Sequence, residues 1–181
     1  MIPSTLALHV LVGFPLGLVY ANATEWVMHK YVLHGLGRRK KTFWSFHWDE
    51  HHGAARRNGM IDEDYLHLLS GWNGQTKEIA ALLGAALIHV PLFAVAPGFA
   101  LGAVYGAVNY YRVHRKAHLD PAWAREHLPW HVDHHMGPNQ DANWCVTRPW
   151  FDWVMGTREK YVGTECEARR NARLAARLAA A

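Results

Sequence analysis

Residues 6–21 read LALHVLVGFPLGLVYA, and they form the centre of a run without charged side chains that extends over residues 4–24. A helix needs about 20 predominantly apolar residues to cross the hydrocarbon core of a bilayer. The run therefore predicts a membrane-spanning helix over 4–24. The first charged side chain of the chain, Glu25, follows directly after it.

A second uncharged run covers residues 79–111. As one helix it would be about 50 Å long, well beyond a hydrocarbon core of about 30 Å. Pro97 and Gly98 lie near its middle, and this pair of residues is a strong helix-breaking signal. The run predicts a hairpin of two membrane helices, over 79–96 and 99–115. The alternative is a buried hairpin inside a soluble helical bundle.

Composition narrows the class of protein. Half of the 181 residues are hydrophobic and 19% are charged, which excludes an intrinsically disordered chain. The mean hydropathy of −0.16 excludes a chain that consists mostly of membrane spans. Two cysteines, Cys145 and Cys166, are too few for a disulfide framework or a cysteine-rich zinc scaffold. A net charge of +4 would suit a nucleic-acid ligand, but the distribution of the charge points elsewhere.

The 19 Lys and Arg residues avoid two parts of the chain: none precedes Lys30, and none lies between Glu78 and Tyr111. The positive-inside rule then places the N-terminus and the Pro97 turn outside and the remainder in the cytoplasm. We expect an all-α integral-membrane bundle, a single domain over 1–181, with three transmembrane helices and a fourth left open. Residues 25–78 and 116–164 would form a cytoplasmic cap, and 165–181 a basic helical tail. In a bacterium the membrane would be the inner one, and no nucleic-acid partner is expected.

Ten of the 14 histidines fall into four boxes, and the charge-based topology brings all four to the cytoplasmic side. The boxes are HKYVLH with His29 and His34, HWDEHH with His47, His51 and His52, HRKAH with His114 and His118, and HVDHH with His131, His134 and His135. The four other histidines, His9, His67, His89 and His127, are interpreted as structural, hydrogen-bonded residues.

The spacing within the boxes indicates metal binding. Side chains three or four residues apart share one face of an α-helix, so the pairs His47/His51 and His114/His118 and the box at 131–135 could each offer two imidazoles to one centre. Adjacent histidines point about 100° apart and could reach two metals. His29 and His34 lie about 140° apart on a regular helix and are not expected to bind one ion.

Imidazole suits zinc, copper, iron and nickel. Ten ligands are too many for one tetrahedral zinc and suit two ions with five or six positions each, which favours iron. Carboxylates inside the boxes either orient the imidazoles or are merely solvated: Asp49, Glu50 and Asp133. Asp141 and Asn143 are weaker candidates for contact with the ligands, directly or through water.

The box series HX4H, HX3HH, HX3H, HX2HH resembles the fatty acid hydroxylase/sterol desaturase superfamily of integral-membrane oxygenases. The resemblance covers about residues 25–161. The sequence EWVMHKYVLHG is similar to the first box of bacterial carotenoid hydroxylases, and the strips that begin at Asn143 and Trp153 resemble the ending of the family. The chain departs from the commoner pattern in its HX3HH second box and in having three crossings where many relatives have four.

The resemblance implies two iron ions, O₂ as co-substrate and an external electron donor, a ferredoxin or a cytochrome. It also implies hydroxylation of an unactivated C–H bond in a lipid-like substrate, such as a fatty acyl chain, a sterol or a carotenoid. A desaturase on the same metal site is the first alternative, and a membrane zinc-dependent lipid hydrolase is the second. A metal carrier is disfavoured, because the boxes lie outside the predicted spans.

Overall fold

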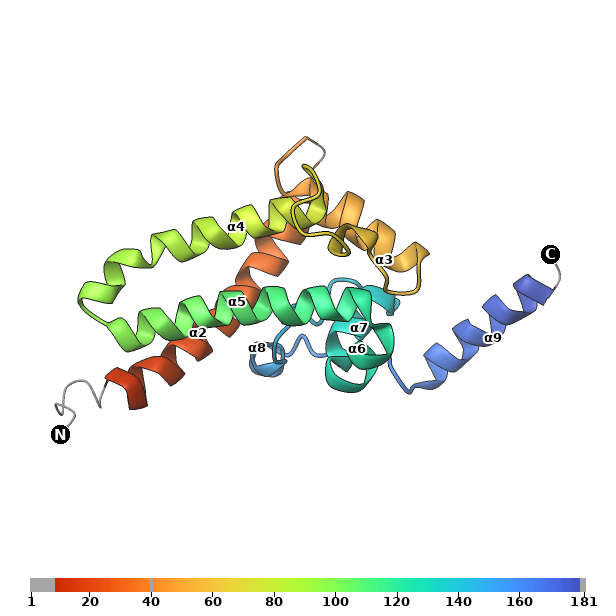
Figure 1. The fold of residues 1–181 in the computed structure, drawn as a ribbon. Coiled ribbons are helices and arrows are strands. Elements are labelled where there is room, and N and C mark those ends of the chain that lie inside the picture. The colour runs from red at the N-terminus through yellow and green to blue at the C-terminus, as the bar shows by residue number, and fades with distance from the viewer. Residues whose placement is uncertain (1–8, 40, 180–181) are drawn as a thin grey trace.

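The computed structural model describes residues 9–39 and 41–179, and this part of the chain is helical, without strands. Three long helices lie alongside one another and carry a cap of shorter helices at one end (Figure 1). The described N-terminus and the hairpin turn lie at the opposite end from the cap. The arrangement therefore separates the histidine-bearing cap from the described N-terminus and the hairpin turn, as the distribution of charge predicted.

The first helix is longer than the sequence suggested. It begins with a π-helical turn over His9–Gly13, continues as α2 (Phe14–Val27) and ends in a second π-helical segment, Met28–Leu36. The expected span over 4–24 thus extends twelve residues further, and residues 4–8 of that span lie outside the described residues. These three segments form one continuous helical rod over residues 9–36, and this rod carries both the first apolar run and the first histidine box.

The second uncharged run folds as the expected hairpin. Helix α4 (Gly74–Ile88) is followed by a short 3-10 segment, Val90–Ala94, and α5 (Pro97–Leu119) returns beside it. The carboxamide oxygen of Asn73 accepts a hydrogen bond from the Thr76 amide at 3.1 Å and caps α4. Pro97 occupies the first turn of α5, where its missing N–H costs no hydrogen bond.

Helices α2 and α5 pack closely because small residues face each other. Gly17 and Gly102 mark the contact: a Cβ built on Gly102 would lie 2.3 Å from the Phe14 carbonyl oxygen, and one on Gly17 would lie 2.3 Å from that of Phe99. Small residues four apart are the usual means by which membrane helices approach closely. The spacing recurs on both helices, with Gly13 and Gly17 on one and Gly98, Gly102 and Gly106 on the other.

The outer faces of the three long helices, namely the first rod, α4 and α5, are apolar. Exposed large side chains cover them, including Leu11, Leu16, Val19, Leu83, Leu87, Ile88, Leu101 and Val108. Two helices, Val10–Leu36 and Gly74–Ala94, are long and apolar enough to cross a membrane. Helix α5 carries the polar side chains Asn109 and Arg112 within the expected span, and the third crossing expected at 99–115 stays a prediction.

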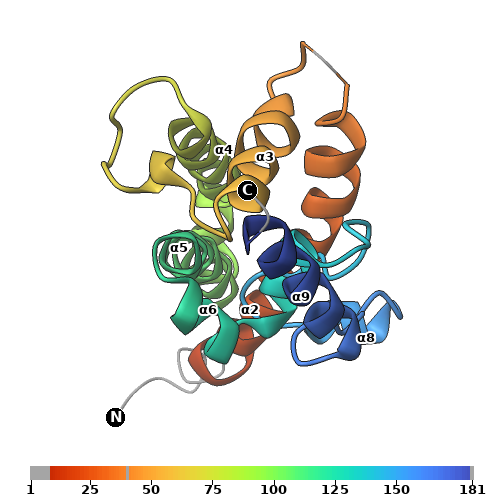
Figure 2. The same ribbon diagram turned by 90° about the vertical axis from the view of Figure 1, so that its right-hand side faces the viewer.

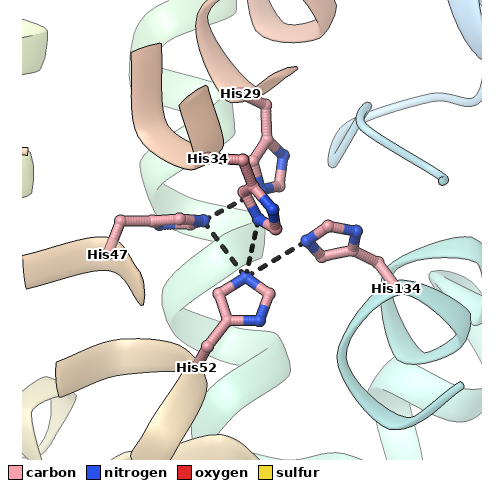
Figure 3. Close-up of side chains that lie close together, drawn as sticks. All are labelled: His29, His34, His47, His52 and His134. Atoms are coloured by element: carbon pink, nitrogen blue, oxygen red, sulfur yellow. Dashed lines mark hydrogen bonds between the residues drawn. The ribbon is translucent and has the colours of Figure 1, made fainter. Parts of the chain in front are cut away.

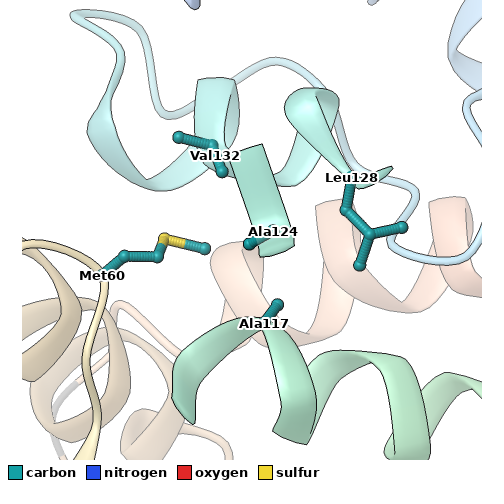
Figure 4. Packing of buried hydrophobic residues seen from close by; sticks show 5 residues of the cluster. All are labelled: Met60, Ala117, Ala124, Leu128 and Val132. Atoms are coloured by element: carbon teal, nitrogen blue, oxygen red, sulfur yellow. The ribbon is translucent and has the colours of Figure 1, made fainter. Parts of the chain in front are cut away.

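The cap is built from the end of α5 and the short helices that follow, α6 (Pro121–His127) and α7 (Pro129–Met136). The Asp120 carboxylate accepts a hydrogen bond from the Trp123 amide at 3.0 Å and caps α6. Figure 2 views the molecule from the end that carries the cap, with α3 (Gly53–Arg57) and α6 near the ends of the long helices. A small apolar cluster joins the cap helices to the loop after α3 (Figure 4): Met60, Ala117, Ala124, Leu128 and Val132.

A strip from Trp144 to Thr157 returns to the first helix and includes α8 (Trp150–Val154). The Glu25 carboxylate accepts hydrogen bonds from the amides of Val146 and Thr147 at 3.0 and 2.9 Å. The Asn22 side chain donates to the Arg148 carbonyl at 2.8 Å. The expected helical tail is α9 (Glu165–Ala179), and residues 180–181 lie outside the described part.

Candidate metal centre

The structure gathers the box histidines into two adjacent groups of buried imidazoles. The first group is His29, His34, His47, His52 and His134 (Figure 3), and the second is His51, His114, His118 and His135. Within each group, one ring nitrogen of every histidine lies within 4.8 Å of the corresponding nitrogens of the others. The groups meet where the rings of His52 and His135 stack with their centroids 4.3 Å apart.

The adjacent histidines divide between the groups as their angular separation predicted. His51 belongs to the second group and His52 to the first, and likewise His135 to the second and His134 to the first. His114 and His118, four apart on α5, share the second group as expected.

Two predictions from regular α-helical spacing are wrong. His29 and His34 share one group, and His47 is grouped with His52 instead of His51. Both pairs lie five residues apart in π-helical segments, Met28–Leu36 and Phe46–His52. The hydrogen bond of a π-helix joins residues five apart, so side chains at this spacing stand one turn apart on the same face.

In the first group, two imidazoles are held in position by backbone carbonyl groups on the side of the ring opposite to the group's centre. The Nδ1 atoms of His29 and His134 lie 2.6 and 2.7 Å from the carbonyl oxygens of Trp144 and Ala142. A carbonyl only accepts, so each Nδ1 carries the proton and each Nε2 presents a lone pair. These lone pairs point toward the group: His29 Nε2 lies 2.9 Å from His47 Nε2, and His134 Nε2 lies 3.2 Å from His52 Nε2.

The second group uses carboxylates as anchors. His51 Nδ1 lies 2.7 Å from Asp62 Oδ2, and His114 Nδ1 lies 2.7 Å from Glu78 Oε1. His118 Nδ1 donates to the Met60 carbonyl at 2.7 Å. Such partners fix the tautomer and ring orientation of metal-binding histidines and raise their basicity.

The donor set fits metal ions. Among the described residues, four buried ring nitrogens of the second group have no hydrogen-bond partner: the Nε2 atoms of His51, His114 and His135, and the Nδ1 atom of His135. Unpaired buried nitrogens are costly, and converging lone pairs repel one another unless a cation lies between them. Bound cations would satisfy these nitrogens, and the all-imidazole inner set suits transition metals.

Burial keeps His52, His134 and His135 neutral. It lowers the pKa of His134 to about 4, and it lowers the pKa of His52 and His135 well below their ordinary value. For the latter two, neighbouring histidines add to the effect. Neutral imidazole is the form that binds metal.

His131, the tenth box histidine, lies beside the second group. Its Nε2 atom is 3.0 Å from His118 Nε2, and its ring centroid is 4.6 Å from that of His135. All ten box histidines are therefore buried in one place, as their common side of the membrane predicted.

The carboxylates suggested by the sequence lie mostly elsewhere. Asp49 is exposed, and Glu50 pairs with Lys77 at 2.7 Å. Asp133 binds the Arg158 guanidinium at 2.7 Å and accepts from the Tyr161 amide at 2.9 Å.

Two other candidates lie near the strip that follows the last box. Asn143 accepts from Arg158 and from the Glu159 amide, both at 2.9 Å, in place of contacting a histidine. Asp141 approaches one, since its Oδ1 lies 3.8 Å from His34 Nδ1.

Sequence reasoning missed Asp62 and Glu78, the two carboxylates that do contact ligand histidines. Glu78 gave one signal, because it is the last charge before a run of 33 uncharged residues. Asp62 gave none, as it lies among other acidic residues in a loop. Tyr65 was also missed: its hydroxyl donates to Glu78 Oε2 at 2.5 Å and lies 3.3 Å from His114 Nδ1.

An apolar cavity of about 140 Å³ opens onto the first group between the long helices. His29, His47 and Tyr65 line its end in the cap, and Tyr20 and His89 line it on the membrane side. Most of the wall between them is formed by Ala, Leu and Val side chains of α4 and α5, including Ala81, Leu82, Ala85 and Val104. The cavity is long and apolar enough to lead from the membrane side of the bundle to the first group of histidines.

A family model described as fatty acid hydroxylase matches residues 14–157. The match covers α2 to α8 and contains all ten box histidines. The chain belongs to the fatty acid hydroxylase family. No match was found among curated proteins or among solved structures. Membership of the fatty acid hydroxylase family confirms the resemblance drawn from the boxes and implies an oxidoreductase.

The carboxylate behind His51 supplies a direct test of the anchoring arrangement. We expect Asp62→Asn to weaken metal binding about 10- to 100-fold, the usual effect of losing such a partner. The amide retains the oxygen that accepts from the Asp64 amide but can turn an N–H toward His51 Nδ1. The control is Asp49→Asn, an isosteric change at an exposed site. Competition with a chelator measures both, and equal affinity in the two variants would contradict the assigned role.

Stability of the metal-free protein should depend on pH. The His134 pKa is lowered from 6.5 to about 4, so between these values the unfolded chain binds more protons than the folded one. The stability is therefore complete above pH 6.5 and is lost as the pH falls through 4. The unfolding temperature of the apoprotein in detergent should fall over this interval, and less steeply in His134→Asn. An unfolding temperature that does not change would refute the expectation.

Proposed function

We propose that this protein is a membrane di-iron oxygenase that hydroxylates an unactivated C–H bond of a lipid-like substrate. The observation that carries the proposal is the pair of adjacent imidazole groups at the mouth of an apolar cavity. Fatty acid hydroxylase membership supports the lipid substrate, and the paired groups support two ions in place of one. Two bound iron ions would supply activation of O₂ and oxidation of the C–H bond.

The residues of the chain hold and shield such a site. Backbone carbonyls and carboxylates behind the rings keep the Nε2 lone pairs directed inward. Imidazole binds metal in its neutral form, so a pair of bound cations would keep most of its positive charge, which would favour acceptance of electrons. The apolar wall formed by α4 and α5 would exclude water and align the substrate chain toward His29 and His47.

The membrane arrangement follows the same proposal. Helix α5 follows both apolar helices in sequence, returns beside α4 and packs against α2 through glycines, so we propose that it forms a third crossing. With the basic residues of the cap on the cytoplasmic side, as the positive-inside rule favours, the metal site would face the cytoplasm. A ferredoxin or cytochrome would deliver electrons there.

Metal analysis with product analysis tests the proposal. The protein would be purified in detergent from iron-replete cells, beside His135→Ala, and its iron and zinc measured per chain. We expect about two irons, with one or both lost from the variant. Lipid mass spectrometry of expressing cells should show an added oxygen, absent with the variant.

Three other results would change the assignment. One zinc per chain without iron would overturn it in favour of a hydrolase. Two zincs would require reconstitution with ferrous iron under anaerobic conditions, and failure to bind iron there would also overturn it. Loss of two hydrogens without added oxygen would identify a desaturase on the same site.

A further inference from the structure

One polar pair lies in the apolar rods, away from the metal ligands. Tyr20 on α2 and His89 at the end of α4 come together across the cavity, with the His89 Nε2 atom 3.1 Å from the Tyr20 hydroxyl oxygen. Their ring centroids are 5.4 Å apart in an edge-on arrangement. A polar side chain inside a membrane segment is costly, and it indicates function by default. The sequence alone gave His89 no partner.

The hydrogen bonding of the pair is directional. His89 Nδ1 donates to the Ala85 carbonyl at 2.6 Å, so in the neutral ring Nε2 is the acceptor. The Tyr20 hydroxyl therefore donates to His89 Nε2. Its oxygen keeps lone pairs that are free to accept one further hydrogen bond.

The pair and the metal ligands line one cavity. Tyr20 and His89 are at one end and His29 and His47 at the other. Tyr20 and His29 are nine residues apart along one continuous helical rod, a rise of about 14 Å. A chain that reached from the pair to the metal groups would place a defined carbon at the ligands.

We propose that the Tyr20–His89 pair binds a hydroxyl group at the end of the substrate that is remote from the reacting carbon. The hydroxyl donates its hydrogen bond to the Tyr20 oxygen, and the apolar chain fills the space toward His29. The inference rests on the proposed function, since it takes the cavity as the substrate site. It adds that the substrate is an amphiphile with its hydroxyl held deep in the membrane segment.

Ligand-induced stabilisation tests the pair without using enzyme activity, because a ligand that binds the folded state raises its unfolding temperature. The metal-loaded full-length protein would be placed in phosphatidylcholine nanodiscs with 1-dodecanol or n-dodecane. We expect dodecanol to raise the unfolding temperature by about 2–4 °C more than dodecane. Tyr20→Phe and His89→Leu should remove that difference. Tyr105→Phe is the matched control, as Tyr105 lies on α5 and is 48% exposed.

Two results would overturn the inference. One is equal stabilisation, or none, by the two probes in the unaltered protein. The other is a preference for dodecanol that survives both variants, which would make the pair a purely structural link between α2 and α4. Iron is measured in the same samples to distinguish failure of this inference from failure of the proposed function. Two bound irons with no difference between dodecanol and dodecane would refute this inference alone. Absence of bound metal would instead count against the proposed function.

Discussion

Replacing His51 or His52 by alanine should remove metal from different places in the same protein. The two residues are adjacent in the chain, yet their rings lie in different groups with their centroids 5.9 Å apart. We expect each single variant to lose about half of the bound metal and the double variant to lose nearly all. Loss of a residue that orients a ligand histidine costs up to about 100-fold in activity. Loss of the histidine itself should cost more than this in all three variants.

Spectroscopy distinguishes the loss of one particular metal ion from a general disruption of the metal centre. The ion that remains in each variant should give a different Mössbauer spectrum, because the two groups differ in the number and anchoring of their imidazoles. His67→Ala is the control, since His67 is exposed and lies outside both groups; it should keep full metal content. Identical residual spectra in the two single variants would contradict the division into two groups.

Replacing Gly102 by alanine should destabilise the bundle. The new Cβ would lie 2.3 Å from the Phe14 carbonyl oxygen and 3.0 Å from Gly17 Cα. Both atoms belong to the backbone of α2, so neither can rotate away and the two helices must separate. Overpacking of this kind costs about 1–3 kcal/mol. The unfolding temperature in detergent should fall, and metal should be lost more readily because α2 leads into the first histidine box.

Gly84 provides the matched control. It lies in the interior of α4, and a Cβ built on it meets no atom within 4 Å among the described residues. Gly84→Ala should be neutral or slightly stabilising, since alanine has the higher helix propensity. An equal loss of stability in both variants would contradict the role given to the α2–α5 contact, because a Cβ at Gly84 meets no atom of another helix within 4 Å among the described residues.

The apolar runs and the four boxes were readable from the sequence because both are local patterns. The lengths of the uncharged runs predicted the rods, and Pro97 predicted the hairpin. The fold of the first rod beyond residue 24 was not readable in this way. Glu25, the first charged residue, marked the end of the predicted span, and only its contact with the strip after Trp144 shows how the helix continues past it.

The sequence by itself determined which residue types gather in the cap, namely ten imidazoles on one side of a bundle of apolar helices. Only the tertiary structure decided how they are grouped, because π-helical segments bring residues five apart to one face in place of residues four apart. It also decided which acids contact the rings. Asp62 and Glu78 lie 11 and 36 residues from the histidines they orient. No local spacing encodes such a contact, since it depends on how separate segments pack.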